Sequence, residues 1–130
     1  MLTMPVFAAG ATKFIFEGDK LASSGTESGF VVINNVKADK TVITVQVRGM
    51  NMEAQTEYWV YHLTPQAGPS VVIGGLKLNK FGSGHLTIEL PYTIPVGTTN
   101  DGRTGYHFGI STIDTAPNKN HVVLYTWVPA

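Results

Sequence analysis

The chain contains no cysteine and few charged residues, and both shortages narrow what it can do. Without cysteine it has no disulfide, no thiolate nucleophile and no cysteine-ligated metal. Charged residues make up 14% of its 130 residues, against about 25% in an average soluble domain. Nine Lys and Arg balance nine Asp and Glu without clustering, which argues against nucleic acid as a partner. A surface close to neutral also opposes self-association only weakly.

Long apolar runs are missing too, because no stretch approaches the roughly 18 apolar residues that cross a membrane as a helix. We therefore expect no membrane span. Residues 1–11, MLTMPVFAAGA, form a short apolar segment with small residues where a signal peptidase would read them, although Met1 to Pro5 include no basic residue. This segment is interpreted as the remnant of a secretory signal, an ordinary apolar segment or a strand exchanged with another molecule.

Helical periodicity is weak, and the chain instead shows about eight short β-prone runs separated by Gly, Pro, Asn, Asp and Ser. The clearest run, 41–48, alternates so that Ile43, Val45 and Val47 share the inner face. Runs spaced about 8 to 15 residues apart match an all-β fold with mostly antiparallel pairing, either a β-sandwich or a small barrel. Of these we predict an antiparallel β-sandwich of the Ig-like or jelly-roll-like kind, with about eight strands. Residues 12–130 are expected to form this single domain. The predicted runs are 12–17, 29–33, 41–48, 56–63, 71–78, 84–90, 106–111 and 121–128.

Turn residues predict where the strands change direction. Asn79 and Gly82 tolerate a left-handed backbone, so 79–82 is predicted to be a hairpin turn. The pair Gly74-Gly75 interrupts an apolar run and predicts a bulge or kink. Two prolines and two glycines make 91–104 the longest expected loop.

No motif in the sequence is specific for catalysis. His62, His85 and His107 lie on different predicted strands without the short spacing of a local metal site, so only the fold could bring them together. Gly82-Ser83-Gly84 resembles a nucleophile elbow, but it has the wrong spacing and no following helix. The acidic residues are scattered over predicted loops and outer faces. We therefore predict a protein that is not an enzyme and needs no cofactor, and a metal-dependent enzyme is the least favoured hypothesis.

A strand that buries one alternating set of side chains displays the other, so the aromatic strands have two alternative outcomes. In the run 56–63 either Trp59 and Tyr61 or Tyr58 is displayed, and the run 121–128 presents the same choice. Displayed aromatic rings would suit stacking on a sugar or docking a protein, whereas core filling is the alternative. The candidate ligand-binding residues are Trp59, Tyr61, Tyr92, Asn100, Asp101, Arg103 and Trp127.

Three stretches, 44–50, 56–63 and 73–84, together resemble the cadence of secreted β-sandwich modules such as the CHRD family. In that family a strand ends in a Gly-Leu pair, an aromatic-rich strand follows after a short loop, and a later hairpin carries Gly-x-Gly. Tyr61-His62 stands where the family has H-x-H, so no metal role is carried over. The resemblance implies an extracytoplasmic, non-catalytic module outside the cell or at its surface.

The leading hypothesis is a non-enzymatic subunit of an extracellular or surface assembly, such as a filament or another homo-oligomer. Its terminal β-prone segments would exchange strands between copies and complete open sheet edges. The residues expected to carry assembly are Phe14, Ile15, Phe16, Val122 and Leu124. The alternative hypothesis is a monomeric ligand-binding module for a glycan or a surface protein, which would use the displayed aromatic residues.

Overall fold

The computed structural model describes residues 11–18, 25–37, 39–52, 57–63, 70–94, 96, 106–115 and 121–129. These residues form nine β-strands, and none of them belongs to a helix long and apolar enough to cross a membrane. In chain order the strands are β1 (Ala11–Ile15), β2 (Glu17–Gly18), β3 (Ser28–Lys37), β4 (Lys40–Arg48), β5 (Glu57–Leu63), β6 (Ser70–Leu78), β7 (Gly84–Leu90), β8 (Tyr106–Ser111) and β9 (Val122–Val128). Every pairing between them is antiparallel, which confirms the predicted all-β antiparallel fold.

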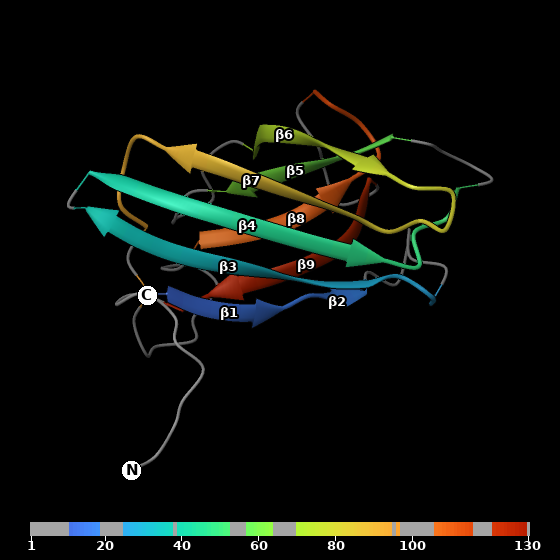
Figure 1. Cartoon of the computed structure of the whole chain (residues 1–130), viewed down its shortest axis with the longest axis horizontal. Coiled ribbons are helices and arrows are strands. Elements are labelled where there is room, and N and C mark those ends of the chain that lie inside the picture. The colour runs from blue at the N-terminus through green and yellow to red at the C-terminus, as the bar shows by residue number, and fades with distance from the viewer. Residues whose placement is uncertain are drawn as a thin grey trace, which may run out of the picture.

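The nine described strands form one nearly closed, barrel-like sheet in the order β1-β3-β4-β7-β6-β5-β8-β9-β2. Figure 1 shows this sheet folded into a front layer with β3, β4 and β7 and a back layer with β5, β8 and β9. β6 and β7 share two residue pairs next to their connecting hairpin, and there the sheet passes from one layer to the other. The predicted sandwich of two separate sheets is therefore not formed. Alternating strands of this length suit a sandwich or a barrel equally well, and pairing at the corners decides between them.

The N-terminal strand makes the second corner and closes the sheet. β1 pairs along five residues with β3, and β2 pairs along two residues with β9. Between these pairings the chain bends at Phe16, whose side chain is buried and whose amide donates to the carbonyl of Gly29 (2.9 Å). One short run of residues therefore holds both edges of the sheet, and the predicted strand 12–17 is divided into β1 and β2.

The core lies between the two layers and follows the predicted alternation. In β4, Ile43, Val45 and Val47 are at most 4% exposed, while Gln46 and Arg48 are exposed to solvent. β4 pairs with β3, its neighbour in the chain, and on its other side with β7. The regular period of two in this strand therefore identified its buried face.

The predicted hairpin at 79–82 joins β6 to β7. The amide of Gly82 donates to the carbonyl of Asn79 (3.0 Å), and Gly82 has a left-handed φ of 76°, which glycine adopts without strain. The side-chain oxygen of Asn79 accepts from the amides of Phe81 (2.9 Å) and Ser83 (3.1 Å). These bonds hold the turn, and with it the start of β7, in place.

The expected irregularity in β6 lies directly before Gly74. Val72 and Gly74 are opposite consecutive residues of β5, so Ile73 is an extra residue in β6. A Cβ added to Gly74 would lie 2.6 Å from Leu86 and 2.7 Å from Ile88, both side-chain atoms of β7. Glycine is needed at this position because side chains of β7 occupy the space that a Cβ atom would take.

Residues 92–94 are tied to the ends of β3 and β4 by a buried polar network. The Asn35 amide nitrogen donates to the carbonyl of Ile94 (2.8 Å), and the Ile94 amide donates to the hydroxyl of Thr41 (3.1 Å). That hydroxyl lies 2.7 Å from the carbonyl oxygen of Tyr92. The network covers one end of the core with the start of the predicted loop, of which residues 95 and 97–104 lie outside the described residues.

Candidate functional site

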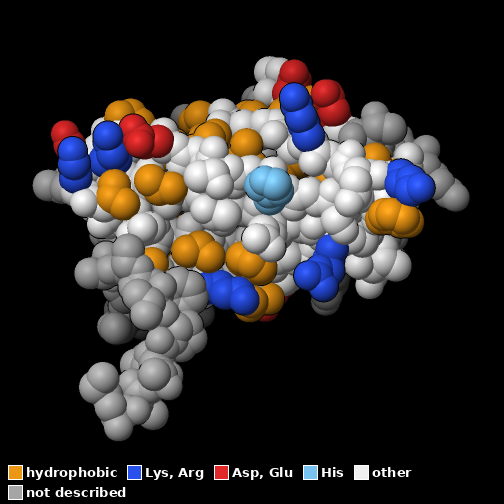
Figure 2. All heavy atoms as spheres, in the orientation of Figure 1, with side chains coloured by type: hydrophobic (Ala, Val, Ile, Leu, Met, Phe, Trp, Pro, Cys, Tyr) orange, Lys and Arg blue, Asp and Glu red, His pale blue; other side chains and the backbone are white. Residues whose placement is uncertain are grey.

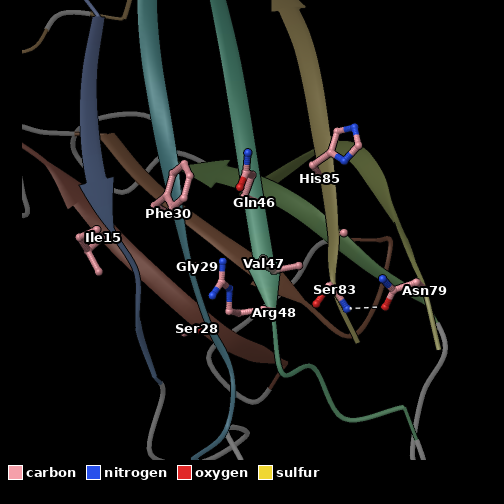
Figure 3. Close-up of a pocket in the computed structure, with 11 residues that line it drawn as sticks. Ile15, Ser28, Gly29, Phe30, Gln46, Val47, Arg48, Asn79, Ser83 and His85 are labelled. Atoms are coloured by element: carbon pink, nitrogen blue, oxygen red, sulfur yellow. Dashed lines mark hydrogen bonds between the residues drawn. The ribbon is translucent and has the colours of Figure 1, made fainter. Parts of the chain in front are cut away.

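An open groove crosses the outer face of the front layer. Its volume is about 680 Å³, and it lies over β1, β3, β4 and β7, beside the hairpin that precedes β7 (Figure 3). The side chains that give it chemical character are Ile15, Phe30, Gln46, Arg48, Asn79 and His85.

The register of the strands assembles this groove from residues far apart in the sequence. Phe30 of β3 is opposite Gln46 of β4, and Gln46 is opposite His85 of β7. Directly opposite residues point to the same face of a sheet, so these three side chains form one row on the outer surface. Ile15 extends the row because it pairs with Phe30, and Arg48 is the next outward residue of β4.

Arg48 gives the groove its charge. It is exposed, and its guanidinium makes no ion pair or hydrogen bond with the described residues. Figure 3 shows its side chain extending from the end of β4 toward Gly29 of β3. Lys13 adds a second positive charge, because its ammonium lies 4.2 Å from the centroid of the Phe30 ring. The described lining includes no Asp or Glu, so the groove is positive and favours an anionic ligand.

The acidic residue next to the groove in sequence, Glu27, acts on the core side of the sheet. It is buried, and its carboxylate accepts from the amide of Thr26 (3.2 Å). Burial and, second, the charge of Glu27 raise the pKa of Tyr58, whose hydroxyl donates to the carbonyl of Asn51 (2.7 Å). Glu27 is not among the residues that line the groove.

The surface around the groove carries little charge. Figure 2 shows a histidine near the centre of this face, surrounded by white atoms of other side chains and backbone, with Lys, Arg, Asp and Glu side chains toward the margins. The side chains of Gln46 and His85 make no hydrogen bond with any residue that the structure describes. Their polar atoms, like those of Arg48, are available to a ligand.

No family model matches the chain, and no curated protein resembles it closely enough to count as a relative. The resemblance to the CHRD family therefore stays a prediction.

Trp59, Tyr61 and Trp127, the predicted ligand-binding aromatic residues of β5 and β9, lie on the outer face of the back layer and differ in exposure. β5 places Tyr58 in the core and Trp59 and Tyr61 on the outer side, the first of the two predicted outcomes. Tyr61 is nevertheless 1% exposed, while Trp127 of β9 is 36% exposed. Of these rings, Trp127 offers the largest free face for stacking.

His107 is packed inside this aromatic cluster. The distances between its ring centroid and those of Trp127, Tyr61 and Tyr125 are 4.4, 5.6 and 5.8 Å. His107 is 9% exposed, and burial lowers its pKa from 6.5 to about 4. Its Nδ1 is buried without a hydrogen-bond partner among the described residues. At neutral pH the ring is therefore uncharged and packs like its aromatic neighbours.

His62 lies on the opposite, inner side of β5. It contacts Tyr92, the one predicted ligand-binding aromatic residue that lies outside β5 and β9. The His62 Nε2 atom and the Tyr92 hydroxyl oxygen are 2.5 Å apart. The rings of Tyr106 and Phe108 also contact His62. Burial lowers the pKa of His62, and burial followed by the nearby Tyr106 raises the pKa of Tyr92. Both groups are therefore neutral at pH 7, and their hydrogen bond belongs to the packed interior.

The three candidate metal ligands are not brought together. His62 faces the interior, His85 is exposed in the groove, and His107 lies in the outer cluster of the back layer. Within the described ranges no group of three His, Asp or Glu side chains is placed to hold a metal ion.

Most of the residues predicted to carry assembly pack within a single chain. Phe16 and Leu124 are both in the core cluster, Phe14 packs against it, and Val122 is buried. Ile15 is 62% exposed and lines the groove. The strand pairing that was expected between copies is thus seen between β2 and β9 of the same molecule.

Asn100, Asp101 and Arg103, the remaining predicted ligand-binding residues, lie outside the described residues. Conversely, Gln46 and Arg48 were predicted only to face outward. Their alternation was visible in the sequence, but the register that places them beside Phe30 and His85 was not, because it joins strands that are distant in the chain.

Proposed function

We propose that the protein is a non-enzymatic binding module that holds an acidic carbohydrate in the groove over β1, β3, β4 and β7. The observation that carries the proposal is the guanidinium of Arg48, which has no partner among the described residues, beside the side chains of Gln46 and His85, which have none there either, in an open groove of about 680 Å³. Binding sites for small ligands usually have about 300–1,000 Å³.

The lining matches the chemistry of a sugar acid. A guanidinium can bind a carboxylate through two parallel hydrogen bonds, which a lysine cannot do. The amide of Gln46 and the ring nitrogens of His85 complement sugar hydroxyls, and the edge of Phe30 with Ile15 supplies an apolar wall for the C–H face of a sugar ring. The positive potential from Arg48 and Lys13 favours an acidic sugar over a neutral one. An extracellular or surface location, which the family resemblance implies, fits such a ligand.

The test is calorimetric titration with galacturonate oligomers and with neutral galactose oligomers of the same length. We expect the acidic oligomer to bind more tightly. Arg48→Gln should weaken its binding about fivefold, or about 1 kcal/mol, because the ion pair would form in a groove open to solvent.

Lys37→Gln is the matched control. It removes the same charge from the opposite end of the β3–β4 pair, roughly 30 Å away along the strands. It should leave the affinity unchanged. Equal affinities of the two oligomers for the wild type, or equal losses in the two variants, would contradict the proposal.

A further inference from the structure

The segment 11–18 is the element whose loss would open the barrel. β1 and β2 are its two halves, and between them they pair with β3 on one side and β9 on the other. No other described segment pairs with both β3 and β9. The sheet is therefore closed by one strand, which is joined to the remaining described strands only on its C-terminal side.

The rest of the barrel provides a well-defined place for this strand. It consists of the free edge of β3, with five residue pairs, the free edge of β9, with two, and the buried site of Phe16 in the core. Nothing in that place depends on which copy of the chain supplies the strand. The same hydrogen bonds and the same burial of Phe16 would form with a strand from a second molecule.

We propose that two copies of this chain exchange residues 11–18 and form a dimer in which each closes the barrel of the other. Reciprocal exchange leaves no edge unpaired, so it ends at a dimer, whereas one-way donation would give a growing chain. The near-neutral composition opposes this association only weakly. This inference stands apart from the proposed ligand, although the exchanged strand would bring Lys13 and Ile15 of the second copy to the groove.

The absence of native cysteine allows a direct test by disulfide formation. Lys13 of β1 and Val32 of β3 are directly opposite in the register and face outward. Such pairs have Cβ atoms about 4.5–5.5 Å apart, and small backbone adjustment brings them within disulfide range. The double variant Lys13→Cys/Val32→Cys should therefore form a disulfide whichever copy supplies the strand.

The decisive sample is a mixture of the two single variants, Lys13→Cys and Val32→Cys, refolded together from denaturant. A disulfide between residues 13 and 32 can then form only between chains. After oxidation, peptide mass spectrometry identifies the linked pair. We expect a 13–32 link whose yield rises with the protein concentration during refolding.

The control mixture carries Thr44→Cys in one chain and Thr87→Cys in the other. These residues are directly opposite in β4 and β7, with their hydroxyl oxygens 3.4 Å apart, and neither strand is exchanged. The 13–32 yield should exceed the 44–87 yield severalfold. The proposal is overturned if the double variant links 13 to 32 within one chain while the mixture gives no more 13–32 than 44–87 product. If the double variant forms no disulfide, Glu17→Cys and Tyr125→Cys at the β2–β9 pairing replace it in the same test.

Discussion

Replacing Gly109 with alanine should destabilise the back layer by crowding Tyr61. A Cβ at Gly109 would lie 2.5 Å from the Tyr61 hydroxyl oxygen and 2.6 Å from two of its ring carbons. Tyr61 is 1% exposed and its ring edge contacts His107, so it has little room to move. Overpacking costs about 1–3 kcal/mol, and replacing a strand glycine with alanine returns about 0.5–1 kcal/mol through backbone entropy. We expect a net loss of about 1–2 kcal/mol in the free energy of unfolding, measured by urea denaturation followed by circular dichroism.

Two comparisons make this prediction refutable. Gly75→Ala is the matched control, because its Cβ would meet Trp59 at an ordinary 3.5 Å, and it should be neutral or slightly stabilising. In a Tyr61→Ala background the cost of Gly109→Ala should disappear, which gives a coupling energy of about 1 kcal/mol or more in a double-mutant cycle. The reasoning fails if Gly109→Ala is as well tolerated as Gly75→Ala, or if its cost is the same with and without the Tyr61 ring.

Two further predictions concern pH and barrel closure. Burial lowers the pKa of His107 from 6.5 to about 4, so as the pH falls this imidazole is protonated in the unfolded chain before it is protonated in the folded one. The contribution of His107 to the free energy of unfolding is therefore present in full above pH 6.5 and is lost as the pH falls toward 4. Urea denaturation at a series of pH values should show a loss that approaches about 3 kcal/mol in the free energy of unfolding, and His107→Phe should flatten this dependence on pH. Parallel pH profiles for the wild type and the variant would refute the prediction. Phe16→Ala should cost about 3–5 kcal/mol because it empties a buried site, whereas Ile15→Ala, at a position 62% exposed, should stay within about 0.5 kcal/mol. Similar urea midpoints for these two variants would mean that Phe16 does not anchor the closing strand.

The features that the sequence predicted are those encoded within a single strand or turn. The alternation in 41–48 identified Ile43, Val45 and Val47 as buried, and Asn79 with Gly82 identified the hairpin. Both predictions depend on residues that are neighbours in the chain, because the alternation of side chains sets the buried face of a strand and the φ angles that Asn and Gly tolerate set the turn.

The closing of the barrel could not be predicted in this way. Whether 12–17 joins one edge, two edges or another molecule depends on hydrogen-bonding partners more than ten residues away, and all three outcomes need the same alternating pattern. The burial of Tyr61 could not be predicted for a related reason. Its outer position followed from alternation, but its burial depends partly on Gly109 in another strand, which leaves space for the ring.

The candidate site was missed for the same reason. Phe30, Gln46 and His85 span 56 positions of the sequence, and only the β3–β4–β7 register sets them in one row. The prediction instead selected aromatic residues of β5 and β9, among which Tyr61 is buried and Trp127 is exposed.

The measurement that tests the proposed function most directly is a nuclear magnetic resonance titration of the isotope-labelled protein with galacturonate oligomers. The account predicts saturable shifts of the backbone amides of Phe30, Gln46, Arg48 and His85, with the amides of Gly109 and Trp127 on the back layer unchanged. Absence of saturable shifts, or shifts centred on Trp127, would contradict the assignment of the groove as the binding site.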